Sequence, residues 1–185
     1  MISTNDLRAG MYIVFEGRVC QVTHYEFYKP GKGSSIVRVK LKDLDTGQTL
    51  DKTWKGEQKV DQAIVTRRPY EYLYNDGAMF HFMDAETYDQ KEIPAAQVEG
   101  ILPFLKENTR VSLVMHESRI LGVELPDFVE LKVVEAEPGV KGDTATGATK
   151  TVKLETGATL TVPLFIVEGD VLKVDTRTGE YVTRV

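Results

Sequence analysis

The sequence is poor in the residues from which disulfides and metal centres are built. Its 185 residues include 1 cysteine and 3 histidines. The single cysteine, Cys20, excludes an intramolecular disulfide, and its apolar surroundings at residues 19–22 favour a buried strand thiol over a nucleophile. His24, His81 and His116 have no His or Cys partner at ligand spacing, so neither a metal site nor a cofactor is predicted.

Long apolar runs are also lacking. No stretch approaches the ~18 apolar residues of a membrane span, and residues 1–6 show neither the basic nor the apolar part of a signal peptide. We therefore expect a cytoplasmic protein with no membrane association. The glycine spacing from Gly142 to Gly147 resembles a phosphate-binding loop, but Ala148 and Thr149 follow where that loop needs Lys and Ser or Thr. Since no other catalytic pattern is present, we predict that the chain is not an enzyme.

What the sequence has in abundance is alternation with a period of two. Val37, Val39 and Leu41 alternate with Arg38 and Lys40, which places apolar side chains on one face of a strand and cations on the other. The same alternation recurs at residues 129–134, 159–162 and 172–175, and glycine-containing turns separate the runs at the spacing of barrels and sandwiches. Only residues 85–89 and 95–105 offer room for short helices. The pattern predicts an all-β fold.

Prolines divide these strands into three sets. The Arg-Arg-Pro step at residues 67–69 follows one set, and Pro126 follows a second. The predicted domains are therefore residues 1–64, 65–127 and 128–185, each near the lower size limit of an independent domain. Each is expected to be a small closed β-barrel, because closure removes exposed sheet edges.

The most informative segment lies between two predicted strands in the first set. Pro30 favours a tight turn, and Gly31 and Gly33 accept positive φ, so Lys29 and Lys32 are expected at the tip of a hairpin. With arms at residues 18–28 and 34–43, the hairpin would be about 30 Å long at ~3.3 Å per residue. An ordinary exposed turn would also contain lysine beside glycine, so the tip alone does not establish a site.

Charge supports a functional interpretation of this hairpin. Residues 27–42 contain no acidic residue, although the formal net charge of the chain is -5. The net charge is +2 for residues 1–64, -5 for residues 65–127 and -2 for residues 128–185. A cationic hairpin on an acidic body indicates a polyanionic partner bound at one face, and not general coating of nucleic acid. The cations concerned are Lys29, Lys32, Arg38, Lys40 and Lys42.

Several motifs together resemble the bacterial translation elongation factor P family over the whole chain. Lys29-Pro30-Gly31-Lys32-Gly33 is similar to the modified-lysine loop of that family, and residues 137–144 are similar to its third-domain loop. The spacing at residues 150–169 and the end at residues 178–185 also resemble the family pattern. Tyr28, where valine is usual, and the Ser-Ser-Ile run at residues 34–36 depart from it.

The resemblance implies three barrels, a KOW-like one and two OB-like ones, in an L shape similar to tRNA. It implies a monomer that binds the 70S ribosome and its rRNA between the P and E sites, beside peptidyl-tRNA, and relieves stalling at consecutive prolines. Lys32 would lie at the CCA end and is the candidate for modification by a lysine-modifying enzyme. Contacts with P-site tRNA are implied for Lys29, Pro30, Gly31, Lys32, Gly33, Arg38, Lys40 and Lys42, and contacts with the E-site codon or tRNA for Gly142, Asp143, Thr144, Tyr181 and Arg184.

Two alternatives remain open on the sequence. One is a paralogue of the factor with another role. The other is a general OB-fold RNA-binding protein, which would stack bases on exposed aromatic side chains. Five aromatic residues of the middle set could supply such a face, although their acidic surroundings favour a place in the core: Tyr70, Tyr72, Tyr74, Phe80 and Phe82.

Overall fold

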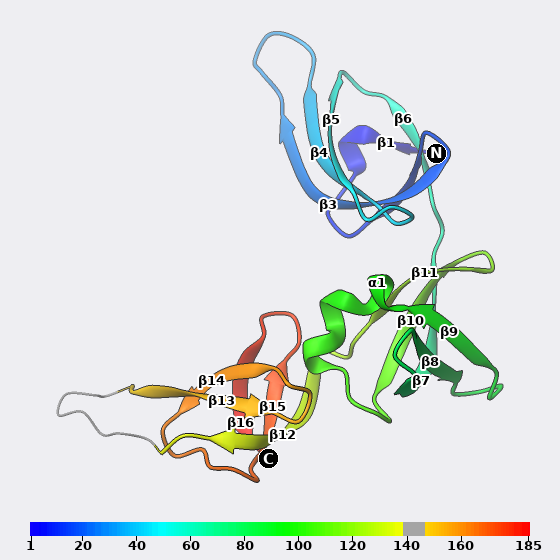
Figure 1. Cartoon of the computed structure of the whole chain (residues 1–185). Coiled ribbons are helices and arrows are strands. Elements are labelled where there is room, and N and C mark those ends of the chain that lie inside the picture. The colour runs from blue at the N-terminus through cyan, green and yellow to red at the C-terminus, as the bar shows by residue number, and fades with distance from the viewer. Residues whose placement is uncertain (139–146) are drawn as a thin grey trace. The chain divides into compact units, whose positions relative to one another are not determined.

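The computed structural model describes residues 1–138 and 147–185, which form two compact units (Figure 1). One unit comprises Met1–Arg67 with Val114–Gly122, and the other comprises Arg68–Leu113 with Val123–Val185. Nearly all regular structure is β-strand, arranged in three sheets, so the predicted all-β fold is confirmed. Within the described ranges, no helix has both the length and the apolar character needed to span a membrane.

The first sheet has the strand order β1-β6-β2-β3-β4-β5. Its inward side chains form a core around Trp54 that includes Cys20, Val37, Val39 and Leu41. The predicted burial of Cys20 is confirmed, and burial raises the pKa of its thiol. The elements of this part of the chain are β1 (Ile2–Ser3), η1 (Thr4–Asp6), β2 (Tyr12–Phe15), β3 (Arg18–Tyr28), β4 (Ile36–Asp43), β5 (Thr49–Lys55) and β6 (Lys59–Gln62).

A bulge in β3 decides which of its side chains face solvent. Val22 pairs with Leu41 and His24 pairs with Lys40, so Thr23 is the extra residue between them. One additional residue reverses the faces of every side chain that follows. His24, Glu26 and Tyr28 are therefore turned outward, while Tyr25 packs against the core and donates its hydroxyl to the carbonyl of Asn5 at 2.8 Å.

The second sheet has the order β11-β10-β7-β8-β9. Four of the five alternating aromatics are buried there, as the sequence indicated, namely Tyr70, Tyr72, Phe80 and Phe82. Tyr74 is the exception. A register shift between Tyr72 and Tyr74 moves its ring to the other face, where it stacks on His81 at 4.4 Å. The strands are β7 (Thr66–Asn75), β8 (Met79–Asp84), β9 (Gln90–Pro94), β10 (Arg110–His116) and β11 (Arg119–Glu124).

The two candidate segments for short helices have different outcomes. Residues 85–89 form a turn and not a helix, because the buried carboxylate of Asp84 accepts hydrogen bonds from the amides of Glu86 at 2.8 Å and Thr87 at 3.1 Å. Residues 95–105 do contain helix, as α1 (Ala95–Val98) followed by the 3₁₀ segment η2 (Glu99–Phe104). Pro103 lies within η2, where its missing N–H prevents a regular α-helix.

The third sheet has the order β14-β13-β12-β15-β16 and encloses an aliphatic core. The alternating residues Val129, Leu131, Leu160, Val162, Leu172 and Val174 all contribute to this core, as predicted. Phe104 of η2 packs against it, and the hydroxyl of Thr156 donates to the carbonyl of Pro103 at 2.6 Å. The strands are β12 (Phe128–Ala136), β13 (Thr149–Leu154), β14 (Thr159–Pro163), β15 (Val171–Asp175) and β16 (Glu180–Arg184).

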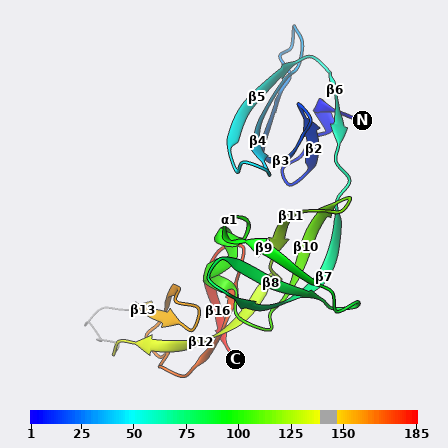
Figure 2. The same cartoon turned by 45° about the vertical axis from the view of Figure 1, so that its right-hand side comes forward.

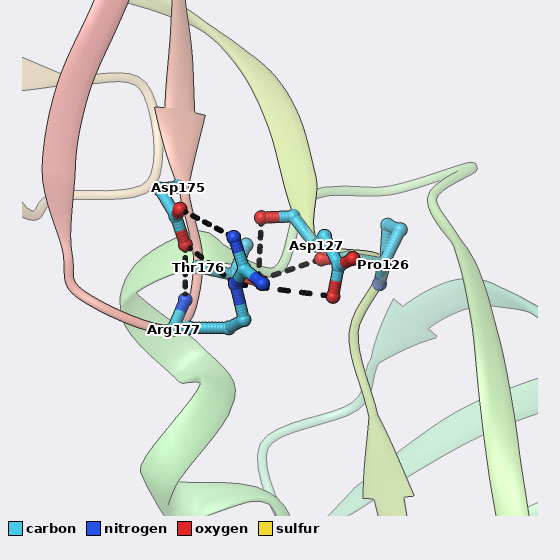
Figure 3. A network of polar contacts seen from close by, with 5 residues as sticks. All are labelled: Pro126, Asp127, Asp175, Thr176 and Arg177. Carbon is cyan, nitrogen blue, oxygen red and sulfur yellow. Dashed lines mark hydrogen bonds and ion pairs between the residues drawn. The ribbon is translucent and has the colours of Figure 1, made fainter.

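A polar network fixes the start of β12 to the turn between β15 and β16 (Figure 3). The hydroxyl of Thr176 donates to the carbonyls of Pro126 at 2.6 Å and Asp127 at 3.1 Å. Arg177 donates to both carboxylate oxygens of Asp175, with its Nη2 at 2.9 Å from Oδ2. These hydrogen bonds hold the pKa of Asp175 at about 2.

Candidate nucleic-acid interface

The hairpin of β3 and β4 projects from the first unit. Its connecting loop extends beyond the other loops of that unit in both views (Figures 1 and 2). We call residues 23–42 the finger and residues 29–35 its tip. Tyr28 pairs with Ile36, so the two arms remain hydrogen-bonded up to the tip. Lys29, Gly31, Lys32 and Gly33 are all exposed at this end.

The tip is wider than the predicted tight turn. Seven residues separate β3 from β4, and only bends occur between them. Gly33 has φ +120°, a conformation that L side chains rarely adopt, whereas Gly31 does not lie in the positive region. Of the two glycines able to accept positive φ, only Gly33 therefore adopts it. A Cβ on Gly33 would lie 3.7 Å from Cγ of Pro30, so the proline ring lies beside this glycine.

The outer face of the finger carries a row of cations along β4. Arg38, Lys40 and Lys42 are exposed, while Val37, Val39 and Leu41 between them are buried. Their cross-strand neighbours are Glu26 and Thr53 for Arg38, His24 and Asp51 for Lys40, and Gln21 and Thr49 for Lys42. The alternation in the sequence predicted this face correctly.

The cations of the finger and its tip do not form ion pairs within the described part of the chain. Among the described residues, no hydrogen bond or ion pair involves the side-chain nitrogens of Lys29, Lys32, Arg38, Lys40 or Lys42. Elsewhere in the described chain, by contrast, Arg18 pairs with Asp43 at 2.9 Å and Arg68 with Asp84 at 2.9 Å. An anion can therefore approach the finger without breaking an existing ion pair.

Two carboxylates, those of Glu26 and Asp51, lie among the cations of this face. Oε1 of Glu26 lies 3.1 Å from Nε2 of His24. This hydrogen bond, the charge of His24 and the nearby Arg38 and Lys40 lower the pKa of Glu26 from its ordinary value. Glu26 is thus ionised at neutral pH, and a shallow groove on this face is lined by both signs of charge, including Glu26, Arg38, Lys40 and Asp51.

Sequence reasoning missed one cation of this face. The register of β5 places Lys55 opposite Ile36, and therefore in the same cross-strand row as Tyr28 next to the tip. Lys55 is exposed. Only the pairing of β4 with β5 reveals this position, because Lys55 is separated from the hairpin by a further turn in the sequence.

The second group of predicted site residues is only partly described. Gly142, Asp143 and Thr144 lie outside the described residues. Tyr181 is partly buried and packs against the third core, so its ring is not fully available to a partner. Arg184 is exposed, with its guanidinium 5.5 Å from the centre of the Phe165 ring and Nη1 at 3.7 Å from Oδ2 of Asp170.

The arrangement suits binding of a polyanion. Unpaired ammonium and guanidinium groups on a projecting strand pair can contact phosphates without reading sequence. Four of the five aromatics that the general OB-fold alternative would use for stacking are buried in the middle sheet, which disfavours that alternative.

Three family models match consecutive parts of the chain. Residues 3–60 match the KOW-like domain of elongation factor P, residues 65–123 match its OB domain, and residues 129–184 match its C-terminal domain. The first two matches agree with the KOW-like and OB-like folds that the resemblance implies.

Relatives named elongation factor P match the chain from end to end. The protein from Moorella thermoacetica is 50% identical over 184 residues, and that from Symbiobacterium thermophilum is 52% identical over 184 residues, with 100% of both chains covered in each comparison. Among solved structures, eukaryotic translation initiation factor 5A from Methanococcus jannaschii is similar, with 26% identity and a TM-score of 0.50 over 66% of this chain and 94% of that one. The chain belongs to the elongation factor P family, and it is a translation elongation factor.

Proposed function

We propose that this elongation factor binds the ribosome between the P and E sites, beside peptidyl-tRNA, and stimulates peptide bond formation at consecutive prolines. One observation carries the proposal. The finger presents Lys32 at an exposed tip. The strand behind it carries Arg38, Lys40 and Lys42, whose side-chain nitrogens make no hydrogen bond or ion pair among the described residues.

The finger would act by positioning. Arg38, Lys40 and Lys42 would contact phosphates and fix the depth and orientation of the finger, since phosphate contacts orient a protein without reading sequence. Lys32 would then lie along the CCA end and restrict the geometries of the peptidyl ester. Ordering of two reactants lowers a barrier without proton transfer from the factor. This mechanism needs an accessible amine at the tip and no catalytic residue.

The charge of the rest of the chain supports a localised contact. The chain has a formal net charge of -5, although the finger has an excess of cations. Repulsion of the acidic remainder by RNA disfavours binding in other orientations. On this proposal, Tyr181 and Arg184 of β16 make secondary contacts with tRNA, through the exposed guanidinium and the partly exposed ring.

Lys32 is also the proposed site of modification. Its side chain is exposed at the tip, where a modifying enzyme can reach the amine. Intact-mass measurement of the protein from its native host tests this. A mass above that of the sequence, localised to Lys32 by fragmentation, is expected, and a mass equal to the sequence would contradict modification.

The function is tested by complementation of a deletion strain. Reporters with and without a run of prolines are compared for the parent, Lys32→Ala and the control Lys59→Ala, which removes an exposed lysine of β6 in the same unit. The parent and Lys59→Ala should restore the proline reporter specifically, and Lys32→Ala should not. Equal expression of both reporters in the deletion strain would reject a role in proline stalling and favour a paralogue with another role.

A further inference from the structure

Tyr28 is the last residue of β3 and lies immediately before the tip. Its side chain is 63% exposed, although it is a large aromatic residue in a strand. Within the described chain, the Tyr28 side chain has no hydrogen bond and no ring contact. The proposed function uses the cations of the finger but gives no role to this ring.

The exposure of Tyr28 follows from the construction of the finger. The bulge at Thr23 turns His24, Glu26 and Tyr28 toward the same face as Arg38 and Lys40. Cross-strand pairing then forms a row in which Tyr28 lies opposite Ile36, and Ile36 lies opposite Lys55. The ring is thus held on the cationic face by the sheet.

The surroundings of the ring combine apolar surface with positive charge. A groove at this end of the finger is lined by Glu26, Phe27, Tyr28, Ile36 and Arg38. Lys29 and Lys32 follow in the tip, and Lys55 completes the row across the sheet. An apolar peptide would leave these cations unpaired. A nucleotide supplies both a flat apolar base and a phosphate, so it matches the two kinds of surface together.

We propose that Tyr28 is a base-stacking residue that takes one unpaired nucleobase of the RNA beside the tip, while Arg38 and Lys55 hold flanking phosphates. The inference rests on the proposed contact between the finger and RNA. It adds a residue that contributes affinity through its ring, whereas the cations contribute through charge. Stacking on an aromatic side chain is tolerant of sequence, because every base has a π-face.

The two contributions differ in their dependence on salt. When a protein contacts phosphates, the logarithm of its affinity falls linearly with the logarithm of the salt concentration, because counterions are released on binding. Removal of the ring should therefore lower affinity by a similar factor at each salt concentration. Removal of a cation should instead reduce the slope.

The test measures binding of the full chain to ribosomes that carry peptidyl-tRNA in the P site, over a range of potassium concentrations. Tyr28→Ala is expected to bind roughly tenfold more weakly with an unchanged slope, from the usual effect of removing one stacked aromatic. Tyr28→Phe should bind like the parent because it keeps the ring. Tyr88→Ala, which removes another exposed tyrosine from the turn at residues 85–89, should also bind like the parent.

The possible failures can be told apart. If the parent protein does not bind these ribosomes, the proposed function and the stacking role are both overturned. If Arg38→Gln weakens binding but Tyr28→Ala does not, the stacking role alone is overturned. Equal losses for Tyr28→Phe and Tyr28→Ala would assign the effect to the hydroxyl and would also overturn it.

A crosslinking experiment identifies the class of partner. The full chain with p-benzoylphenylalanine in place of Tyr28 is bound to the same ribosomes and irradiated. The crosslinked adducts are then separated into those on RNA and those on protein. The proposal expects an adduct on an unpaired nucleotide. Adducts on ribosomal protein alone would overturn it.

Discussion

Arg38 of β4 lies directly across the sheet from Glu26 of β3, yet no ion pair joins the two side chains. Glu26 is instead hydrogen-bonded to His24 at 3.1 Å. The guanidinium of Arg38 is therefore positioned by the sheet and remains open to an external anion. This relationship predicts that Arg38 carries phosphate affinity and little stability.

The first prediction concerns the substitution Arg38→Gln. Loss of one phosphate contact should weaken ribosome binding at low salt and reduce the slope of log affinity against log salt by about 0.7 to 0.9. The melting temperature should change little, because Arg38 is exposed and unpaired within the described chain. Arg110→Gln, an exposed arginine of β10, is the matched control and should leave the slope unchanged. An unchanged slope for Arg38→Gln would show that this cation does not meet phosphate.

The second prediction compares two glycines of the tip. A Cβ added to Gly31 or Gly33 would not clash with a neighbouring atom. Only Gly33 has a positive φ, at +120°. Gly33→Ala should therefore strain or rearrange the tip, at a cost of roughly 1–2 kcal/mol, and reduce rescue of proline stalling. Gly31→Ala should keep the parental backbone, as judged by amide chemical shifts. Parental shifts and full rescue for Gly33→Ala would contradict the tip conformation described above.

The third prediction concerns the acid stability of the second unit. The pKa of Asp175 is lowered from 3.8 to about 2, chiefly by its hydrogen bonds with Arg177. A lowered pKa means that the ionised carboxylate stabilises the folded state above pH 3.8, and that this contribution disappears as the pH falls through the folded value. Asp175→Asn should therefore melt below the parent at pH 6, with the difference closing between pH 4 and pH 2. A difference that is constant over this range would contradict the assigned role of the ion pair.

Much of the finger could be predicted from sequence because its alternation is regular. Hydrophobic and cationic residues follow each other strictly along β4, and the two faces of a strand are fixed by that period. The absence of acidic residues at 27–42 likewise located the cationic face. The alternating runs at residues 129–134, 159–162 and 172–175, which form strands of the third sheet, were predicted for the same reason.

The bulges could not be predicted. Thr23 and the register shift after Tyr72 have no distinctive local sequence, yet each reverses the faces of the residues that follow. The first places Tyr28 beside the cations, and the second removes Tyr74 from the core. Lys55 was missed for a related reason, because its place depends on the register of β5.

Residues 85–89, a candidate segment for a short helix, form a turn because of a side-chain interaction. Asp84 offers its carboxylate to two amides of the segment and so stabilises a turn in competition with a helix. The tip of the finger was predicted too tight for a similar reason, since Pro-Gly favours a turn but does not fix the length of the loop.

The most direct test of the account is the rate of peptide bond formation between two prolines in a reconstituted translation system. The parent should accelerate this step and leave a step between two non-proline residues nearly unchanged. Lys32→Ala should lose most of the acceleration while retaining the parental melting temperature and ribosome binding within a few fold, because one exposed tip residue contributes little to either. Lys59→Ala should behave as the parent. Full acceleration by Lys32→Ala would contradict the claim that the amine at the tip carries the function.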